Sequence, residues 1–348
     1  MKLNDRKKGI LKEVVIRFID NAEPVSSQNI AGSANLGLSP ATIRKEMAEL
    51  EELGYLSHPH TSSGRVPSDK GYRFFVDNFI RKNLSLITGH KNDTAVMVRA
   101  DISRVINREM EFETILKKSS EQLSRMTNYL SMVVAPAIYN TRFRHIELLE
   151  LSRNHIMLVL ITDNGRIFKR NFLVEGLFNY LDFQTTANII NSNLRGRSLS
   201  DAGIENIKIS DSNAYLLPLI KKIMETVKKC INDAPGYNSI YIHGTSSILN
   251  QPDFLEINKI HALLKIIENE YLLINLLLNM SEDEDFIIRI GSEISEEGTD
   301  DLSLVASRYH INNQPSGTIG VLGPKRMNYF KVINILNAFI ANFSEIFS

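Results

Sequence analysis

The residues best suited to chemistry lie near the N-terminus, where hydroxyl and cationic side chains follow a helix-start signal. Ser39 can accept hydrogen bonds from the free amides of a first helical turn, and Pro40 suits the next position because its missing N–H costs nothing there. Thr42, Arg44 and Lys45 fall on the outer side of this helix. Such groups in the first turns of a helix are typical of contacts to phosphates and base edges in the major groove of DNA.

The apolar residues of this segment show which side is buried. They recur at spacings of four, three and three, which is one helical stripe: Ile43, Met47, Leu50 and Leu53. Two further helices are expected upstream, one with a stripe over residues 10–19 and a shorter one over residues 25–31 in which a serine can serve as N-cap. Residues 32–37 supply the turn before Ser39. The pattern therefore predicts a helix-turn-helix.

A basic hairpin is expected directly after the third helix. Tyr55 and Leu56 form a short strand, Gly64 permits a tight turn, and Val66 returns before Pro67 ends the hairpin. Hairpins of this type lie along a phosphate backbone or place an arginine in the minor groove. Together these elements predict a winged helix-turn-helix. The candidate DNA-contacting residues are Ser26, Ser27, Gln28, Ser39, Pro40, Ala41, Thr42, Arg44, Lys45, His58, His60, Thr61, Ser62, Ser63 and Arg65.

The rest of the chain alternates between helical and strand patterns, which indicates an α+β protein. The first part is expected to hold a helix over 72–86, a polar linker over 85–94, a long helix over 102–129 and a strand over 131–136. A compact middle unit follows, with strands over 144–151, 156–162 and 166–174 and helices over 181–194 and 215–231. The last part is expected to hold a strand over 239–243, a helical stripe over 260–278, strands over 286–290, 302–309 and 318–322, and a helix over 328–343.

With these elements the sequence resembles the heat-inducible transcription repressor family HrcA. The N-terminal helices and hairpin carry the first part of the resemblance. Further blocks follow in the same order as in the family: 241–254, 288–291, 303–306, 317–324 and 326–329. Three positions depart from it, because the family usually has Gly and Arg where this chain has Ser26 and Gln28, and Asn where it has Lys45. These departures bear on individual DNA contacts.

The resemblance implies a domain plan and a function. It implies a winged helix-turn-helix over 1–84, a linker over 85–101, a GAF-like α+β domain over 102–141 and 237–348, and an inserted dimerising domain with a three-stranded antiparallel sheet over 142–236. It also implies a homodimeric repressor of chaperone operons that binds double-stranded DNA at an inverted repeat called CIRCE. Heat shock would release it, and the GroE chaperonin would modulate its activity.

The composition is that of an ordinary globular protein, and its net charge does not by itself indicate DNA binding. The 348 residues carry no formal net charge, although residues 1–82 hold 13 Lys and Arg against 10 Asp and Glu. The length suggests two or three domains. A single cysteine, Cys230, fits a reducing compartment. No signal core opens the chain, and the longest apolar run, residues 271–278, is far shorter than the ~20 residues of a membrane span. We therefore expect a soluble cytoplasmic protein.

Several patterns that could indicate an enzyme or a cofactor fail on spacing. His58 and His60 lack a third metal ligand nearby, and zinc needs three or four. The glycines over 317–323 do not follow a phosphate-loop pattern and suit a strand better. His243, Ser246, Ser247 and Asp253 lack the nucleophile elbow of a hydrolase, and the acidic runs 282–285 and 296–301 lack a calcium-loop pattern. We expect no enzyme, no metal and no cofactor.

Two other functions stay open on the sequence. The first is an effector-sensing winged-helix regulator of a metabolic operon, in which the GAF-like domain binds a small molecule. The second is a hydrolase or transferase with a DNA-targeting domain, against which the lack of an assembled catalytic motif argues.

Overall fold

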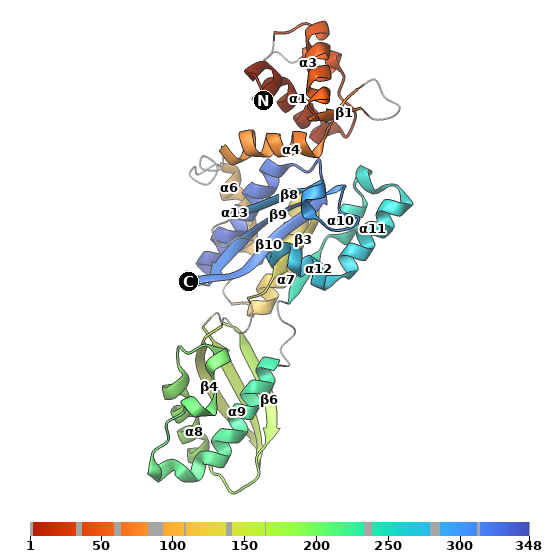
Figure 1. Ribbon diagram of the computed structural model, residues 1–348. Coiled ribbons are helices and arrows are strands. Elements are labelled where there is room, and N and C mark those ends of the chain that lie inside the picture. The colour runs from red at the N-terminus through yellow and green to blue at the C-terminus, as the bar shows by residue number, and fades with distance from the viewer. Residues whose placement is uncertain are drawn as a thin grey trace.

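The computed structural model describes residues 3–32, 37–58, 64–82, 93–107, 109–136, 141–163, 165–232, 239–278, 286–311 and 314–347. Figure 1 shows three packed units in a row. The N-terminal unit lies at one end, a central unit with a five-stranded sheet lies in the middle, and an inserted unit with a three-stranded sheet lies at the other end.

The N-terminal unit consists of three helices and a short hairpin. The helices are α1 (Asp5–Asn21), α2 (Ser27–Ala31) and α3 (Pro40–Glu52). Strand β1 (Leu56–Ser57) pairs antiparallel with β2 (Val66–Pro67). Asn4 caps α1 by accepting a hydrogen bond from the amide of Lys7, which satisfies one of the free N–H groups of the first turn. The apolar stripes of α1 and α3 face one another in a buried core.

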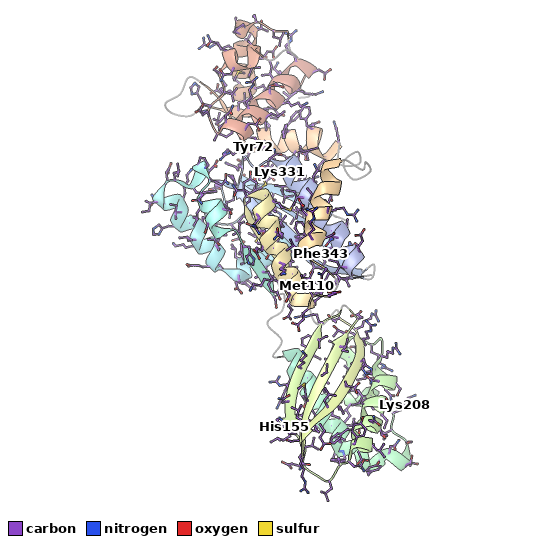
Figure 2. All side chains as sticks on the ribbon, turned by 180° about the vertical axis from the view of Figure 1, so that it is seen from behind. Tyr72, Met110, His155, Lys208, Lys331 and Phe343 are labelled. Atoms are coloured by element: carbon purple, nitrogen blue, oxygen red, sulfur yellow. The ribbon has the colours of Figure 1, made fainter. Side chains whose placement is uncertain are left out.

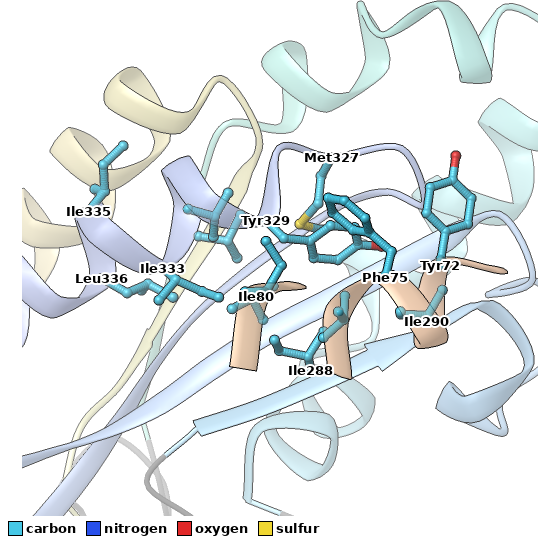
Figure 3. Close-up of a cluster of buried hydrophobic side chains, with 14 of the residues drawn as sticks. Tyr72, Phe75, Ile80, Ile288, Ile290, Met327, Tyr329, Ile333, Ile335 and Leu336 are labelled. Atoms are coloured by element: carbon cyan, nitrogen blue, oxygen red, sulfur yellow. The ribbon is translucent and has the colours of Figure 1, made fainter. Parts of the chain in front are cut away.

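Helix α4 (Asp69–Phe75) joins this unit to the central one and continues into a π-helical turn, η1 (Val76–Ile80). Ser68 caps α4 through the amide of Gly71. Tyr72 and Phe75 of α4 and Ile80 of η1 are buried against strand β8 and helix α13 of the central unit, as Figure 3 shows. A single hydrophobic cluster therefore runs from α1 and α3 through α4 into the central unit.

Ion pairs reinforce this junction. Asp69 accepts hydrogen bonds from Lys325 Nζ at 2.8 Å and from the amide and hydroxyl of Ser292 at 3.1 Å each. Burial alone would raise the pKa of Asp69, but these three donors hold that pKa below its usual value. Arg73 forms a bidentate pair with Glu293, whose second carboxylate oxygen lies 2.8 Å from the arginine Nε. The junction is therefore both apolar and charged.

The central unit is a three-layer structure around an antiparallel sheet. Its strand order is β7 (Ile240–His243), β3 (Leu130–Val134), β10 (Gln314–Pro324), β9 (Leu302–Ile311) and β8 (Phe286–Ile290). One face is covered by α6 (Asp93–Val105), α7 (Phe112–Thr127) and α13 (Tyr329–Ile346), and the other by α10 (Thr245–Leu249), α11 (Ile257–Glu268) and α12 (Glu270–Leu278). Successive residues alternate between the two cores: Val133 and Val305 face one, and Met132 and Leu304 the other.

The inserted unit lies between β3 and β7 in the sequence and has its own core. Its strands are β4 (Phe143–Ser152), β5 (His155–Thr162) and β6 (Ile167–Leu173), in that order, and its helices are α8 (Tyr180–Leu194) and α9 (Leu217–Asn232). Both helices pack on one side of the sheet. Short 3₁₀ turns complete the described chain: η3 (Leu199–Asp201), η4 (Ile204–Asn206), η5 (Asp211–Leu216), η6 (Pro252–Phe254) and η7 (Gly291–Ile294).

The structure confirms a mixed α+β chain with antiparallel sheets and contains every strand that the sequence predicted beyond the hairpin. Two helix predictions were wrong. The long helix over 102–129 is two helices, and the first begins at Asp93, within the segment expected as linker. The stripe over 260–278 is also two helices, divided at Asn269.

An asparagine side chain bonds the backbone at each break. The carboxamide oxygen of Asn107 accepts from the amide of Glu109, and that of Asn269 accepts from the amide of Leu272. Such local bonds offer the backbone an alternative to the helical ladder. None of the described helices combines the length and hydrophobicity that crossing a lipid bilayer requires.

Gly71 provides a test of how closely α4 packs on the hairpin. An added Cβ at this position would overlap the carbonyl oxygen of Tyr55. We expect Gly71→Ala to lower the free energy of unfolding by about 1–3 kcal/mol, even though alanine is the better helix former. The measurement is denaturant unfolding followed by circular dichroism.

Gly32→Ala is the matched control. Gly32 has an ordinary helical backbone, and the nearest atom to an added Cβ lies 3.9 Å away. This variant should be neutral or slightly more stable. Equal effects of the two substitutions would contradict a tight contact at Gly71.

Candidate nucleic-acid interface

Helix α3 begins as the sequence predicted. The hydroxyl of Ser39 accepts from the amide of Thr42 at 3.2 Å and lies 3.0 Å from the Thr42 hydroxyl. Pro40 occupies the first turn. Both hydroxyl groups are therefore used partly within the helix, where they fix its first turn.

The two sides of α3 differ sharply in exposure. Ile43, Met47 and Leu50 are buried against α1, whereas Arg44 and Lys45 are exposed. Ala41 is also exposed, next to the half-buried Thr42. Arg44 forms no ion pair with any residue that the structure describes. The outer side of α3 thus presents cations beside a small residue.

Two acidic residues of α3, Glu46 and Glu49, turn toward α1, which the sequence pattern did not predict. Glu46 is only 8% exposed and binds Lys7 Nζ at 3.1 Å and Arg6 at 3.4 Å. Lys7 also binds Glu49 at 2.7 Å. Hydrogen bonds to Glu49 and Glu46 raise the pKa of Lys7, and Lys7 in turn lowers the pKa of Glu49. Cations of α1 therefore neutralise Glu46 and Glu49 of α3.

The serine hydroxyl at the start of α2 is already hydrogen-bonded within the helix cap. The Ser26 hydroxyl caps α2 by accepting from the amide of Asn29 at 3.2 Å, and it donates to the side chain of the same residue at 2.8 Å. Ser27 is half-buried and Gln28 is exposed. Of the three residues predicted here, Gln28 is the most accessible.

The base of the hairpin is anchored to the rest of the unit. The backbone of Arg65 exchanges two hydrogen bonds of 2.9 Å with Val25, and its Nε lies 2.8 Å from a carboxylate oxygen of Glu51. The Arg65 side chain is only 15% exposed. An added Cβ on Gly64 would lie 2.7 Å from the backbone of Pro24, so only glycine fits there without a shift. His58 is exposed, while His60, Thr61, Ser62 and Ser63 lie outside the described residues.

The described part of the chain contains no assembled catalytic triad, phosphate-binding loop or metal site. His243 Nδ1 lies 2.6 Å from the Ser120 hydroxyl, but Asp253 binds Arg326 at 2.9 Å instead of completing a triad. The glycines over 317–323 belong to strand β10, as expected. No cluster of three or more metal-ligating side chains is present among the described residues.

Comparison with known proteins identifies the family. Residues 113–333 match the family model for the HrcA protein C terminal domain. The chain is 35% identical to the heat-inducible transcription repressor HrcA of Pelotomaculum thermopropionicum over 99% of this chain and 97% of that protein. It is 36% identical to that of Natranaerobius thermophilus over 98% and 96%. The chain belongs to the HrcA family.

The HrcA family is one of transcription repressors and not of enzymes, so the resemblance and the absence of an enzymatic role are confirmed. The HrcA model begins after the N-terminal unit, but the relatives extend across that unit as well. A solved structure described only as a hypothetical protein shares the fold with a TM-score of 0.63. It is 23% identical over 99% of this chain and 97% of the other.

The cap of α3 yields a test. We expect Ser39→Ala to lower the free energy of unfolding by about 0.5–2 kcal/mol, because the amide of Thr42 loses its partner. Urea unfolding followed by circular dichroism measures the change.

Ser27→Ala serves as the control, since Ser26 and not Ser27 caps α2. It should change stability by less than about 0.5 kcal/mol. A Ser39 variant as stable as the Ser27 variant would show that the cap does not hold α3.

Proposed function

We propose that this HrcA-family chain represses chaperone operons by binding an inverted-repeat operator of the CIRCE type as a homodimer in the bacterial cytoplasm. In this proposal the N-terminal unit is a winged helix-turn-helix that binds double-stranded DNA. The observation that carries the proposal is the polarity of α3, in which Arg44 and Lys45 face outward while Glu46 is buried against α1.

Helix α3 is the proposed recognition helix. Its first turns, from Ser39 to Lys45, would enter the major groove, where Arg44 can contact a guanine edge or a phosphate. Glu46 and Glu49 point toward α1 and are paired with Lys7. This orientation matters because a carboxylate on the DNA-facing side of α3 would repel the phosphates. Ser26, which caps α2, and Ser27 and Gln28 in its first turn would lie along the sugar-phosphate backbone of the DNA.

The hairpin is the proposed wing. His58, His60, Thr61, Ser62 and Ser63 would lie against phosphates beside the groove. Arg65 can join them only by leaving Glu51, to which it is bound at 2.8 Å. We therefore assign the wing a smaller share of the binding energy than α3.

The central unit is the proposed GAF-like domain, and residues 142–236 the proposed dimerising insertion. The connectivity supports this division, because β3 and β7 are adjacent strands of one sheet although the whole inserted unit separates them in sequence. The inserted unit also has a hydrophobic core distinct from both cores of the central sheet.

The uncovered face of the inserted sheet is the proposed dimer surface. Figure 2 looks onto this sheet, with α8 and α9 on its far side. Buried residues of β5 point to the helices, so the alternate residues Met157, Val159 and Ile161 point away from them. Val159 pairs with Glu147 on one side and Lys169 on the other. An apolar row between opposite charges suits contact with a second copy around a twofold axis.

Heat release and dependence on the GroE chaperonin complete the proposal. Domains are stable by only ~5–15 kcal/mol, so heating can deplete the fraction that is competent to bind. A chaperonin that restores this fraction would be diverted when other proteins unfold. Repression of chaperone genes would then end during stress.

Binding to the operator tests the proposal. The full chain is titrated with the CIRCE repeat and with a scrambled duplex at one salt concentration, before and after a heat pulse, with and without GroE. The proposal predicts specific binding that falls after heating and recovers with GroE. Equal binding to both duplexes would overturn operator recognition, and binding that ignores heat and GroE would overturn the switch.

Arg44→Ala tests the assigned recognition helix. We expect operator binding to weaken by about 1–3 kcal/mol, because a cationic contact to DNA is lost. Fluorescence anisotropy at fixed salt measures the affinity. Arg153→Ala removes the same charge from an exposed turn of the inserted unit and should leave the affinity unchanged. Equal affinities of the two variants would remove Arg44 from the interface.

Val159→Asp tests the dimer surface. A charge in the middle of the apolar row should weaken the dimer by about 2 kcal/mol or more, roughly 30-fold, while each chain stays folded. Sedimentation velocity measures the dissociation constant. The control is Lys208→Asp, an exposed position outside the sheet. A Val159→Asp protein that remains as dimeric as this control would exclude the sheet face.

A further inference from the structure

A cleft of about 580 Å³ lies between the N-terminal and central units. Phe18, Ser57 and Tyr72 line it from one side, and Lys325 and Arg326 from the other. This volume is within the usual range of small-molecule pockets. The cleft lies directly beneath the base of the hairpin, because Ser57, Val66 and Pro67 form part of its wall.

The Tyr72 hydroxyl is the unusual group of this cleft. The residue is only 1% exposed, and its oxygen has no hydrogen-bond partner in the described part of the chain. Figure 3 shows this oxygen pointing away from the hydrophobic cluster that holds the ring. Burial raises the pKa of Tyr72, so the group stays a neutral donor and acceptor. A buried hydroxyl without a partner is unfavourable, and it marks a position that a polar ligand atom can fill.

The charges of the cleft are balanced. Three cations and three anions line it: Lys70, Lys325, Arg326, Asp69, Asp253 and Asp301. Lys325 binds Asp69 at 2.8 Å, and Arg326 binds Asp253 at 2.9 Å. A charged ligand would meet lining groups of its own sign as well as groups of the opposite sign. The balance therefore favours a neutral ligand.

The ion pairs leave both donors and acceptors unused. An ammonium group has three N–H donors, and Lys325 directs one of them to Asp69. A carboxylate has about four acceptor sites, and Arg326 uses only part of those on Asp253. Hydroxyl groups match such a wall because each one donates and accepts through the same atom.

We propose that this cleft binds a small neutral polyhydroxyl molecule of about the size of a sugar. The Tyr72 hydroxyl bonds one ligand hydroxyl. Lys325, which is paired with Asp69, and Asp253, which is paired with Arg326, bond others. Because the ligand touches both units, it links the position of the hairpin to the central sheet. An effect of the ligand on operator affinity rests on the proposed function, whereas ligand binding itself does not.

Saturation-transfer NMR on the full-length protein tests the proposal with D-ribose, D-glucose and trehalose as probes. We expect at least one probe to bind the unchanged protein, and Tyr72→Phe to weaken that binding about tenfold or more. Tyr72→Phe removes a hydroxyl that has no described partner, so it should fold normally, which circular dichroism checks. Tyr271→Phe removes the same atom from an exposed site on α12 and should bind as the unchanged protein does.

Two results would overturn the proposal. One is the absence of binding by all three probes, which would mean that water alone fills the cleft. The other is equal binding by the Tyr72→Phe and Tyr271→Phe proteins. A protein that binds a probe but not the operator would refute the proposed function and leave the cleft standing. A protein that binds the operator but none of the probes would support the proposed function and refute the cleft proposal.

Discussion

The packing of α4 between two units is the contact on which the rest of the structure depends. Tyr72 and Phe75 on this helix belong to the same hydrophobic cluster as Ile10 of α1 and Ile290 of β8. Burial of apolar surface supplies most of the favourable free energy in such a junction. The ion pair between Asp69 and Lys325 adds a geometric constraint, because it holds α4 in one register against the central unit. The proposed recognition helix therefore has a fixed position relative to the central sheet.

The inserted unit is connected more loosely. Its core is separate, and its clearest described link to the central unit is Arg166, which lies over the rings of Phe112 and Phe168 and binds Glu113. A dimer formed through this unit would hold each N-terminal unit far from the dimer surface, because the inserted and N-terminal units lie at opposite ends of the chain. Because operators with two half-sites require a defined spacing, the α4 junction and the link between the inserted and central units would both bear on recognition.

Local patterns in the sequence were sufficient to predict many of the helices and strands. The Ser39–Pro40 start, the stripe that includes Ile43 and Met47, and the alternating strands of both sheets depend on neighbours in sequence, and the structure contains them. The breaks at residues 106–111 and at Asn269 were missed because an asparagine on a helical stripe does not by itself show which hydrogen bond its side chain makes.

The site was predicted less completely, since its electrostatics arise from residues far apart in the chain. Burial of Glu46 depends on Lys7 of another helix, and the position of Arg65 depends on Glu51. The cleft beside Tyr72 brings together residues more than 250 positions apart, such as Lys70 and Lys325. No spacing rule connects such residues, so only the folded chain reveals these relations.

Native-state hydrogen exchange tests the shared core most directly. The opening free energy of the slowest amides is measured for α1, α4 and β9 in the full chain under increasing denaturant. A single core predicts that the three elements open together with one free energy. If the amides of α1 and α4 opened at a much lower free energy than those of β9, the N-terminal unit would be an independent domain and the account would be wrong.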